Sequence, residues 1–177
     1  MNEEGLVKSL IDSLAVLTRA DLDDSDGAII DVFYNLYEVG LVRVEIVDHT
    51  DRNSIASLLK TVLPNMKTFV EDETDTFPST TFECSCVVRS GLQFLLDNYR
   101  DFPTLNKSLE EFKSSLDLEE FDDCFENYTP GIFDISIDLQ LVSTQIEKLP
   151  SHHYRWWSRG SNLGGTSFSH RIKNLHE

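Results

Sequence analysis

The first third of the chain carries hydrophobic residues at the spacing of an α-helix. Between residues 6 and 17 they recur every three or four positions, at Leu6, Leu10, Leu14 and Leu17. This spacing places them on one face and predicts an amphipathic helix. A second set with the same spacing runs from Ile29 to Tyr37, and Gly40 is placed to end that helix.

Two other segments alternate between hydrophobic and polar residues, which is typical of β-strands with one buried face. One is Leu41–Val47 and the other is Ile132–Leu141, where the alternation is strict. We expect these two segments to pair in a small β-sheet. Helices outnumber strands and do not interleave with them as a parallel sheet requires. The sequence therefore predicts an α+β fold, a mostly helical single domain with a small sheet.

The middle of the chain contains an interrupted helix and an ambiguous segment. Hydrophobic residues from Ile55 onward have helical spacing, and Pro64 is expected to stop or kink that helix. Residues 71–78 are acidic and poor in hydrophobic residues, which predicts a surface loop. Thr80-Thr81-Phe82-Glu83 fits a capping box that opens a helix to about Tyr99. Alternate residues from Phe82 to Val88 are also hydrophobic, so the pattern leaves helix and strand open for residues 81–88.

Charge divides the chain into two parts. The net charge of −16 combines a net charge of +3 on residues 151–177 with −19 on residues 1–150. We therefore distinguish an acidic body, 1–150, from a basic, aromatic, Gly/Ser-rich tail, 151–177. A body this acidic repels nucleic acid and anionic membranes, so direct nucleic-acid binding is disfavoured except through the tail. The acidic start of the chain lacks the pattern of a secretory signal, and we expect a cytoplasmic protein.

The tail contains the densest group of residue types that dominate protein interfaces. These are Tyr154, Arg155, Trp156, Trp157 and Arg159. Three interpretations compete: the tryptophans pack into a groove of the body, they dock a partner protein, or the group stacks on nucleic acid. The charge of the body counts against the third.

Acidic residues concentrate in two predicted helices between residues 105 and 128. The candidates for contact with a partner are Glu110, Glu111, Glu119, Glu120, Asp122 and Asp123. They are either the solvated face of amphipathic helices or a surface complementary to a basic protein. The two interpretations do not exclude each other.

Motifs for catalysis are missing from the sequence. It contains no nucleophile elbow, phosphate-binding loop, dinucleotide fingerprint or zinc-protease motif. The three cysteines are expected to be reduced thiols, and no metal or cofactor is predicted. His152, His153, Asn162 and His170 resemble a metal-dependent nuclease only in composition, so a small metal-dependent hydrolase is the least favoured function.

The function expected from these patterns is protein binding without catalysis. The acidic body would bind a basic partner, as an inhibitor or immunity protein of a toxin or enzyme that acts on nucleic acid does. The alternative is an accessory subunit that is tethered to a larger assembly through residues 151–177.

Overall fold

The fold is built from α-helices, which the computed structural model describes in residues 2–20, 25–46, 48–78, 81–102, 104–128 and 149–157. They are α1 (Glu3–Leu17), α2 (Ser25–Val42), α3 (His49–Asp75), α4 (Phe82–Asn98), α5 (Asn106–Ser114), α6 (Leu118–Asn127), the 3₁₀ turn η3 (Ser151–His153) and α8 (Tyr154–Trp157). None of these ranges contains a strand, so the expected α+β class is wrong and this part of the chain is all-α.

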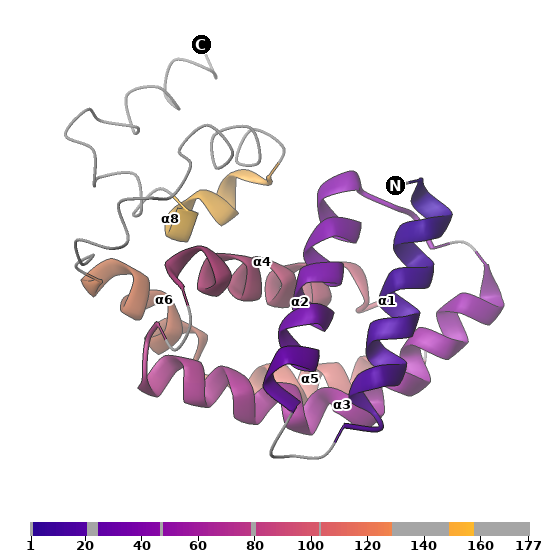
Figure 1. Cartoon of the computed structure of the whole chain (residues 1–177), viewed down its shortest axis with the longest axis horizontal. Coiled ribbons are helices and arrows are strands. Elements are labelled where there is room, and N and C mark those ends of the chain that lie inside the picture. Colours follow the sequence, from indigo (N-terminus) through magenta and orange to yellow (C-terminus); the bar gives the residue numbers. More distant parts are fainter. Residues whose placement is uncertain are drawn as a thin grey trace, which may run out of the picture.

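The central packing is between α2 and α4, with α1 beside α2 and α3 below them (Figure 1). Two glycines allow the backbones of α2 and α4 to approach closely. A β-carbon at Gly91 of α4 would overlap the carbonyl oxygen of Phe33, and one at Gly40 of α2 would overlap the ring of Phe94. These contacts fix the position of Phe94 against α2.

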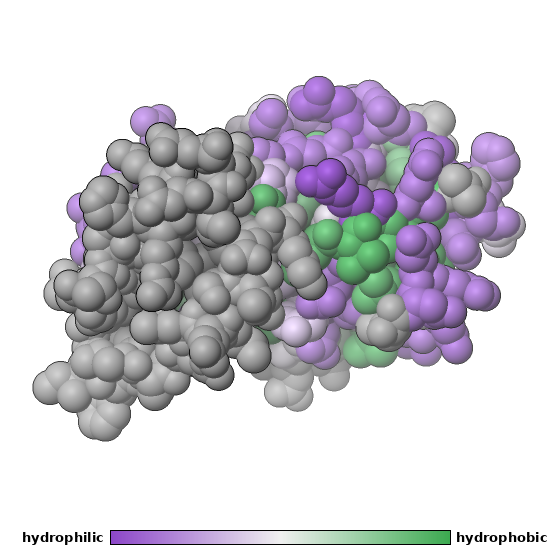
Figure 2. Space-filling view, turned by 90° about the horizontal axis from the view of Figure 1, so that it is seen from above, coloured by the Kyte–Doolittle hydropathy of each residue, from purple (hydrophilic) through white to green (hydrophobic). Residues whose placement is uncertain are grey.

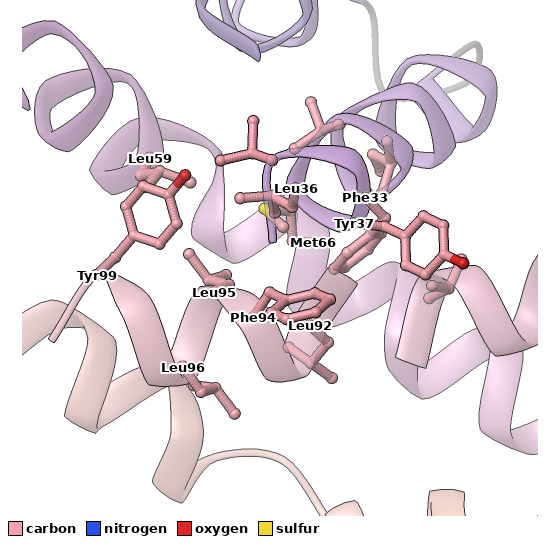
Figure 3. Close-up of a cluster of buried hydrophobic side chains, with 14 of the residues drawn as sticks. Phe33, Leu36, Tyr37, Leu59, Met66, Leu92, Phe94, Leu95, Leu96 and Tyr99 are labelled. Atoms are coloured by element: carbon pink, nitrogen blue, oxygen red, sulfur yellow. The ribbon is translucent and has the colours of Figure 1, made fainter. Parts of the chain in front are cut away.

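The core between these helices is hydrophobic and aromatic (Figure 3). Its fully buried side chains include Phe33, Leu36, Tyr37, Leu59, Met66, Leu92, Leu95 and Tyr99. The stripes of α1 and α2 that the sequence predicted point into this core. Within the described ranges, no helix combines the length and the hydrophobicity needed to cross a bilayer.

The segment Leu41–Val47 shows why the strand expected there does not form. Gly40 does not end α2, because its missing side chain serves the contact with Phe94 inside the helix. The helix ends at Val42, and Arg43 adopts a left-handed conformation with φ 56°. The amide of Val44 then donates to the carbonyl oxygen of Val39 at 3.1 Å, as in a Schellman cap. The other expected strand, 132–141, lies outside the described residues.

Helix α3 continues through Pro64 to Asp75, so of the two outcomes expected at Pro64 the helix does not stop there. A proline inside a helix costs about 3 kcal/mol. Met66, Phe69 and Val70 are all buried after it, and burial of such side chains contributes about 1.5–3 kcal/mol each. The acidic residues after position 70 are also attached to α4, because the buried Glu73 accepts a hydrogen bond from the Ser85 hydroxyl. The surface loop expected at 71–78 is therefore helical as far as Asp75.

The ambiguous segment 81–88 is helical. The Thr81 hydroxyl accepts a hydrogen bond from the Cys84 amide at 3.2 Å and caps the first turn of α4. Helix α6 packs against this end of α4 through aromatic rings. The ring centroid of Phe82, the first residue of α4, lies 5.7 Å from that of Phe125 and 5.0 Å from that of Tyr128. This contact places α6 beside the beginning of α4.

Candidate functional site

Residues 149–157, which we call the C-terminal segment, pack onto α4 (Figure 1). Trp156 and Trp157 are only 3% and 2% exposed. Both indole Nε1–H groups donate to the Ser90 hydroxyl oxygen of α4, each at 2.8 Å. One hydroxyl oxygen has two lone pairs, so Ser90 satisfies both donors. These two side chains therefore pack against the body, which is the first of the three interpretations of the tail.

The buried Arg89 of α4 joins the C-terminal segment to α6. Its Nε and Nη2 donate to the two carboxylate oxygens of Asp122, at 2.7 and 3.3 Å. The guanidinium also lies over the Trp156 ring, 4.4 Å from its centroid. Both members of the ion pair are shielded, with side chains 5% and 9% exposed. Such a pair is held by its geometry, and removal of one member leaves a buried charge.

A chain of hydrogen bonds leads from Arg89 along α4 to its C-terminal end. The Arg89 Nη1 donates to Gln93 Oε1 at 3.1 Å, and Gln93 Nε2 donates to Asp97 Oδ1 at 3.0 Å. The other oxygen of Asp97 lies 3.4 Å from Nε2 of His152. Arg89, Gln93 and Asp97 are spaced by four residues, so they share one face of α4. The chain orients Asp97 toward the C-terminal segment.

His153 follows His152 and is completely buried. Its ring lies 4.6 Å from the Phe94 ring and 5.2 Å from the Trp156 ring, between centroids. Neither ring nitrogen has a hydrogen-bond partner among the described residues. Burial, with smaller contributions from His152 and Arg89, lowers the pKa of His153 to about 3. The imidazole is therefore neutral at pH 7, and it carries an unused lone pair.

Asp97, His152 and His153 form the one group of possible metal ligands among the described residues that meets at close range. One ligand atom from each lies within 4.8 Å of the other two. Asp97 and His152 are exposed, whereas His153 lies beneath them. Two imidazoles and a carboxylate are a donor set that suits transition metals.

Asp97 also lines a groove of about 560 Å³ at the C-terminal ends of α2 and α4. Its charged lining residues are Arg43, Glu45, Arg52, Asp97 and Asp101. Arg52 is held over the Phe102 ring, 4.5 Å from its centroid. The groove therefore presents both signs of charge, and the histidine and aspartate group stands at its margin.

A second candidate site is the exposed acidic surface of α6, which we define by Glu119, Glu120 and Asp123. None of the three forms an ion pair with another described residue. Glu119 and Glu120 stand in the first turn of α6, where carboxylates interact favourably with the helix dipole. The charge of this surface is therefore not neutralised within the described chain.

Few large hydrophobic side chains are exposed in the described part of the chain. The face seen from above is mostly hydrophilic where the structure describes it, with a hydrophobic patch (Figure 2). Among the described residues, the large hydrophobic residues that stay exposed are Val16, Tyr34 and Val42, at 59, 48 and 50%. They belong to α1 and α2 and not to α6. None of these three side chains therefore contributes to the α6 acidic surface.

The structure separates the residues that the sequence grouped. Asp122 is buried with Arg89 and does not belong to the acidic surface. Glu110 and Glu111 of α5 are exposed beside Arg100 and Lys107, at 3.9 and 3.6 Å. The side chains of Tyr154 and Arg155, and the whole of Arg159, Asn162 and His170, lie outside what the structure describes.

The interpretation of the tail as a tether depended on free tryptophans. Trp156 and Trp157 are instead part of the core, so a partner reaches their rings only if the C-terminal segment leaves α4. The tether hypothesis therefore gains no support from the described part of the tail.

Sequence reasoning missed the residues of α4 that organise this region: Arg89, Ser90, Gln93 and Asp97. A signal for three of them exists, because the polar residues at positions 89, 93 and 97 recur at intervals of four and so share one face of the helix. A polar stripe on a buried helix needs partners. What the pattern does not reveal is that the partners come from α6 and from residues 149–157.

No family model matches this chain, and no match is found among curated proteins or among solved structures.

Proposed function

We propose that this protein is a non-catalytic binding module whose α6 acidic surface engages a basic partner protein. The observation that supports the proposal is the set of three exposed carboxylates, Glu119, Glu120 and Asp123, without an ion pair to any other described residue. They stand on a body with a net charge of −19. A surface of this kind is complementary to a cationic one.

The proposed mechanism is electrostatic steering followed by close contact. A field of one sign raises the rate of encounter with an oppositely charged protein, and salt screens it over about 10 Å at 0.1 M. An enzyme or toxin that acts on nucleic acid has a cationic site for phosphates. An inhibitor or immunity protein with the α6 acidic surface would occupy such a site and exclude the nucleic acid.

Affinity purification of the full chain at low salt, from its native cells, tests the proposal. The decisive comparison is between two double variants, E119Q/E120Q and E3Q/E4Q. Each variant removes two exposed carboxylates from the first turn of a helix, so the changes in net charge and in helix-dipole interaction match. We expect a stoichiometric basic protein to be retained by the wild type and by E3Q/E4Q, and to be lost by E119Q/E120Q.

Association kinetics with the captured partner provide the second measurement. Steering predicts that the association rate falls steeply as salt rises, and that E119Q/E120Q flattens this dependence while E3Q/E4Q does not. Equal capture by both double variants, or an association rate that does not depend on salt, would contradict a role for α6.

A further inference from the structure

We infer that Asp97, His152 and His153 bind a divalent transition-metal ion of the zinc class, which would fasten the C-terminal segment to the end of α4. The inference does not depend on the proposed protein-binding function. It rests on the distances between the ligand atoms, on a hydrogen bond that orients the carboxylate, and on the unused nitrogens of a buried histidine.

The distances already approach those of a metal site. In tetrahedral zinc sites with bonds of about 2.0–2.1 Å, neighbouring ligand atoms lie about 3.3 Å apart. The oxygen of Asp97 and the nitrogen of His152 are 3.4 Å apart, which fits one edge of such a tetrahedron. The ligand atom of His153 completes a triangle whose sides are all within 4.8 Å. A shift of about 1–2 Å in the histidine rings brings all three atoms onto one ion.

Asp97 is held in the orientation that a ligand needs. Its Oδ1 accepts a hydrogen bond from Gln93 Nε2 at 3.0 Å, and its Oδ2 is the atom that faces His152. Gln93 is itself held by Arg89, which binds its Oε1 at 3.1 Å. Carboxylates that bind metals are commonly hydrogen-bonded through the oxygen that does not face the ion. Gln93 is therefore a positioning residue for Asp97.

The burial of His153 distinguishes this group from a cluster of exposed side chains. The side chain is 0% exposed, and neither of its nitrogens has a hydrogen-bond partner in the described chain. Leaving a buried polar group unsatisfied is unfavourable, and native proteins avoid it. A metal ion between His153, His152 and Asp97 satisfies the nitrogen that points toward the other two ligands. The rings of Phe94 and Trp156 pack against His153, with centroids 4.6 and 5.2 Å from its own.

The three ligands leave one side of the ion open. Asp97 and His152 are exposed, with side chains 42% and 54% accessible, and Asp97 lines the groove at the ends of α2 and α4. A fourth ligand would be water or an exchangeable anion that enters from this groove. The two protein elements joined by the ion are α4 and η3, so binding of metal and docking of the C-terminal segment would reinforce each other.

Titration calorimetry of the metal-free full chain with Zn²⁺ tests the inference. We expect one zinc ion per chain, and we expect D97N and H152Q each to weaken its binding at least tenfold. Asparagine keeps the oxygen that accepts from Gln93, and His152 is half-exposed, so both variants should remain folded. The matched controls are D101N, an exposed carboxylate of the same groove, and H49Q, an exposed histidine at the start of α3. Both should bind zinc as the wild type does.

Tryptophan fluorescence gives a second readout that reports on the site itself. The chain has two tryptophans, and both lie in the C-terminal segment within four residues of His153. Zinc should change their emission and their protection from a soluble quencher in the wild type, and not in D97N.

Three results would overturn the inference. One is the absence of zinc binding at micromolar concentrations. Another is equal binding by the wild type, D97N and H152Q, which would place the metal at cysteines or at other histidines. The third is zinc binding that leaves the emission of the two tryptophans unchanged.

Discussion

The C-terminal segment and the α6 acidic surface both hold residues that the sequence predicts to contact a partner, but Trp156 and Trp157 are buried whereas Glu119 and Glu120 are exposed. The predicted contact residues are aromatic and basic in the C-terminal segment, as at binding hot spots, and acidic on α6, where the basis is charge complementarity. In the C-terminal segment, Trp156 and Trp157 are buried against α4, with their indole N–H groups satisfied by Ser90. On α6, Glu119 and Glu120 remain exposed. Interface-type residues therefore indicate a surface only where the body offers them no partner.

Asp122 shows how sharp this division is. It follows Phe121 in the middle of the acidic run and is nevertheless buried, because Arg89 of α4 binds both of its oxygens. Its neighbour Asp123 is exposed on the same helix. Adjacent carboxylates thus serve different purposes, and the difference comes from the helix face on which each one stands.

The largest expected effect tests whether the C-terminal segment belongs to the core. We expect Trp157→Ala to lower the free energy of unfolding by about 3–5 kcal/mol, because it leaves a cavity beside the Tyr37 ring. The substitution does not remove the partner of any described charged group. Urea unfolding followed by circular dichroism measures the change. Tyr34→Ala, at a ring that is 48% exposed, is the control and should cost much less. If both variants lose a similar free energy of unfolding, Trp157 does not belong to the core.

The second prediction compares the two adjacent aspartates. Asp122→Asn should cost about 3 kcal/mol, because the buried guanidinium of Arg89 loses its counter-charge. Asp123→Asn should change stability by less than about 0.5 kcal/mol. The double variant R89M/D122L should recover much of the loss, since it removes both charges. If Asp122→Asn is as mild as Asp123→Asn in urea unfolding, the ion pair does not hold α6 to α4.

A third and smaller effect concerns Ser90. Ser90→Ala leaves two buried indole N–H groups without an acceptor, at a cost of about 2 kcal/mol. Ser57→Ala, at an exposed position inside α3, has a similar effect on helix propensity without stranding a buried donor. The difference between the two variants in thermal or urea unfolding isolates the shared hydroxyl. Equal stability of the two variants would mean that other groups accept these hydrogens.

The fourth prediction concerns the reactivity of the Cys86 thiol, which reports on the position of the C-terminal segment without a change of sequence. Cys86 is buried beneath Trp156, with its sulfur 3.9 Å from the Trp156 carbonyl oxygen. Burial raises the pKa of this thiol, and Glu83 and Cys84 add to the shift. Cys86 should therefore hold a smaller fraction of thiolate and be less accessible than the half-buried Cys84. We expect its reaction with a disulfide reagent at pH 8 to be slower by a factor of about ten or more.

Trp157→Ala should accelerate the reaction of Cys86 and leave that of Cys84 nearly unchanged, as followed by mass spectrometry of the labelled peptides. Fast labelling of Cys86 in the wild type would show that the C-terminal segment leaves α4 readily. The tether interpretation of the tail would then regain its physical basis.

The helices were largely predictable, and their ends were not. Hydrophobic spacing placed α1, α2 and the first half of α3 correctly, because a buried face imposes its period on the sequence. Gly40 was expected to end α2, but it serves contact with Phe94, and the stop falls at Arg43. Pro64 does not end α3, because burial of the residues after it outweighs the lost hydrogen bond.

The candidate sites were predictable only in part. The acidic character of α6 follows from composition, and the structure leaves Glu119 and Glu120 exposed. The group formed by Asp97, His152 and His153 was not foreseen, because more than fifty residues separate Asp97 from the two adjacent histidines along the chain. Gln93 and Ser90 were missed for a related reason. Their importance depends on groups that arrive from α6 and from residues 149–157.

The sequence by itself determined the opposite charges of body and tail, the amphipathic helices and the supply of recognition-type residues, since all of these are properties of composition and of local spacing. Only the tertiary structure decided which of those residues are exposed. Burial depends on contacts between distant segments: Ser90 with Trp156, Arg89 with Asp122, and Asp97 with His152. A local pattern carries no record of such contacts, because each is made by side chains whose neighbours in space are not neighbours in the chain.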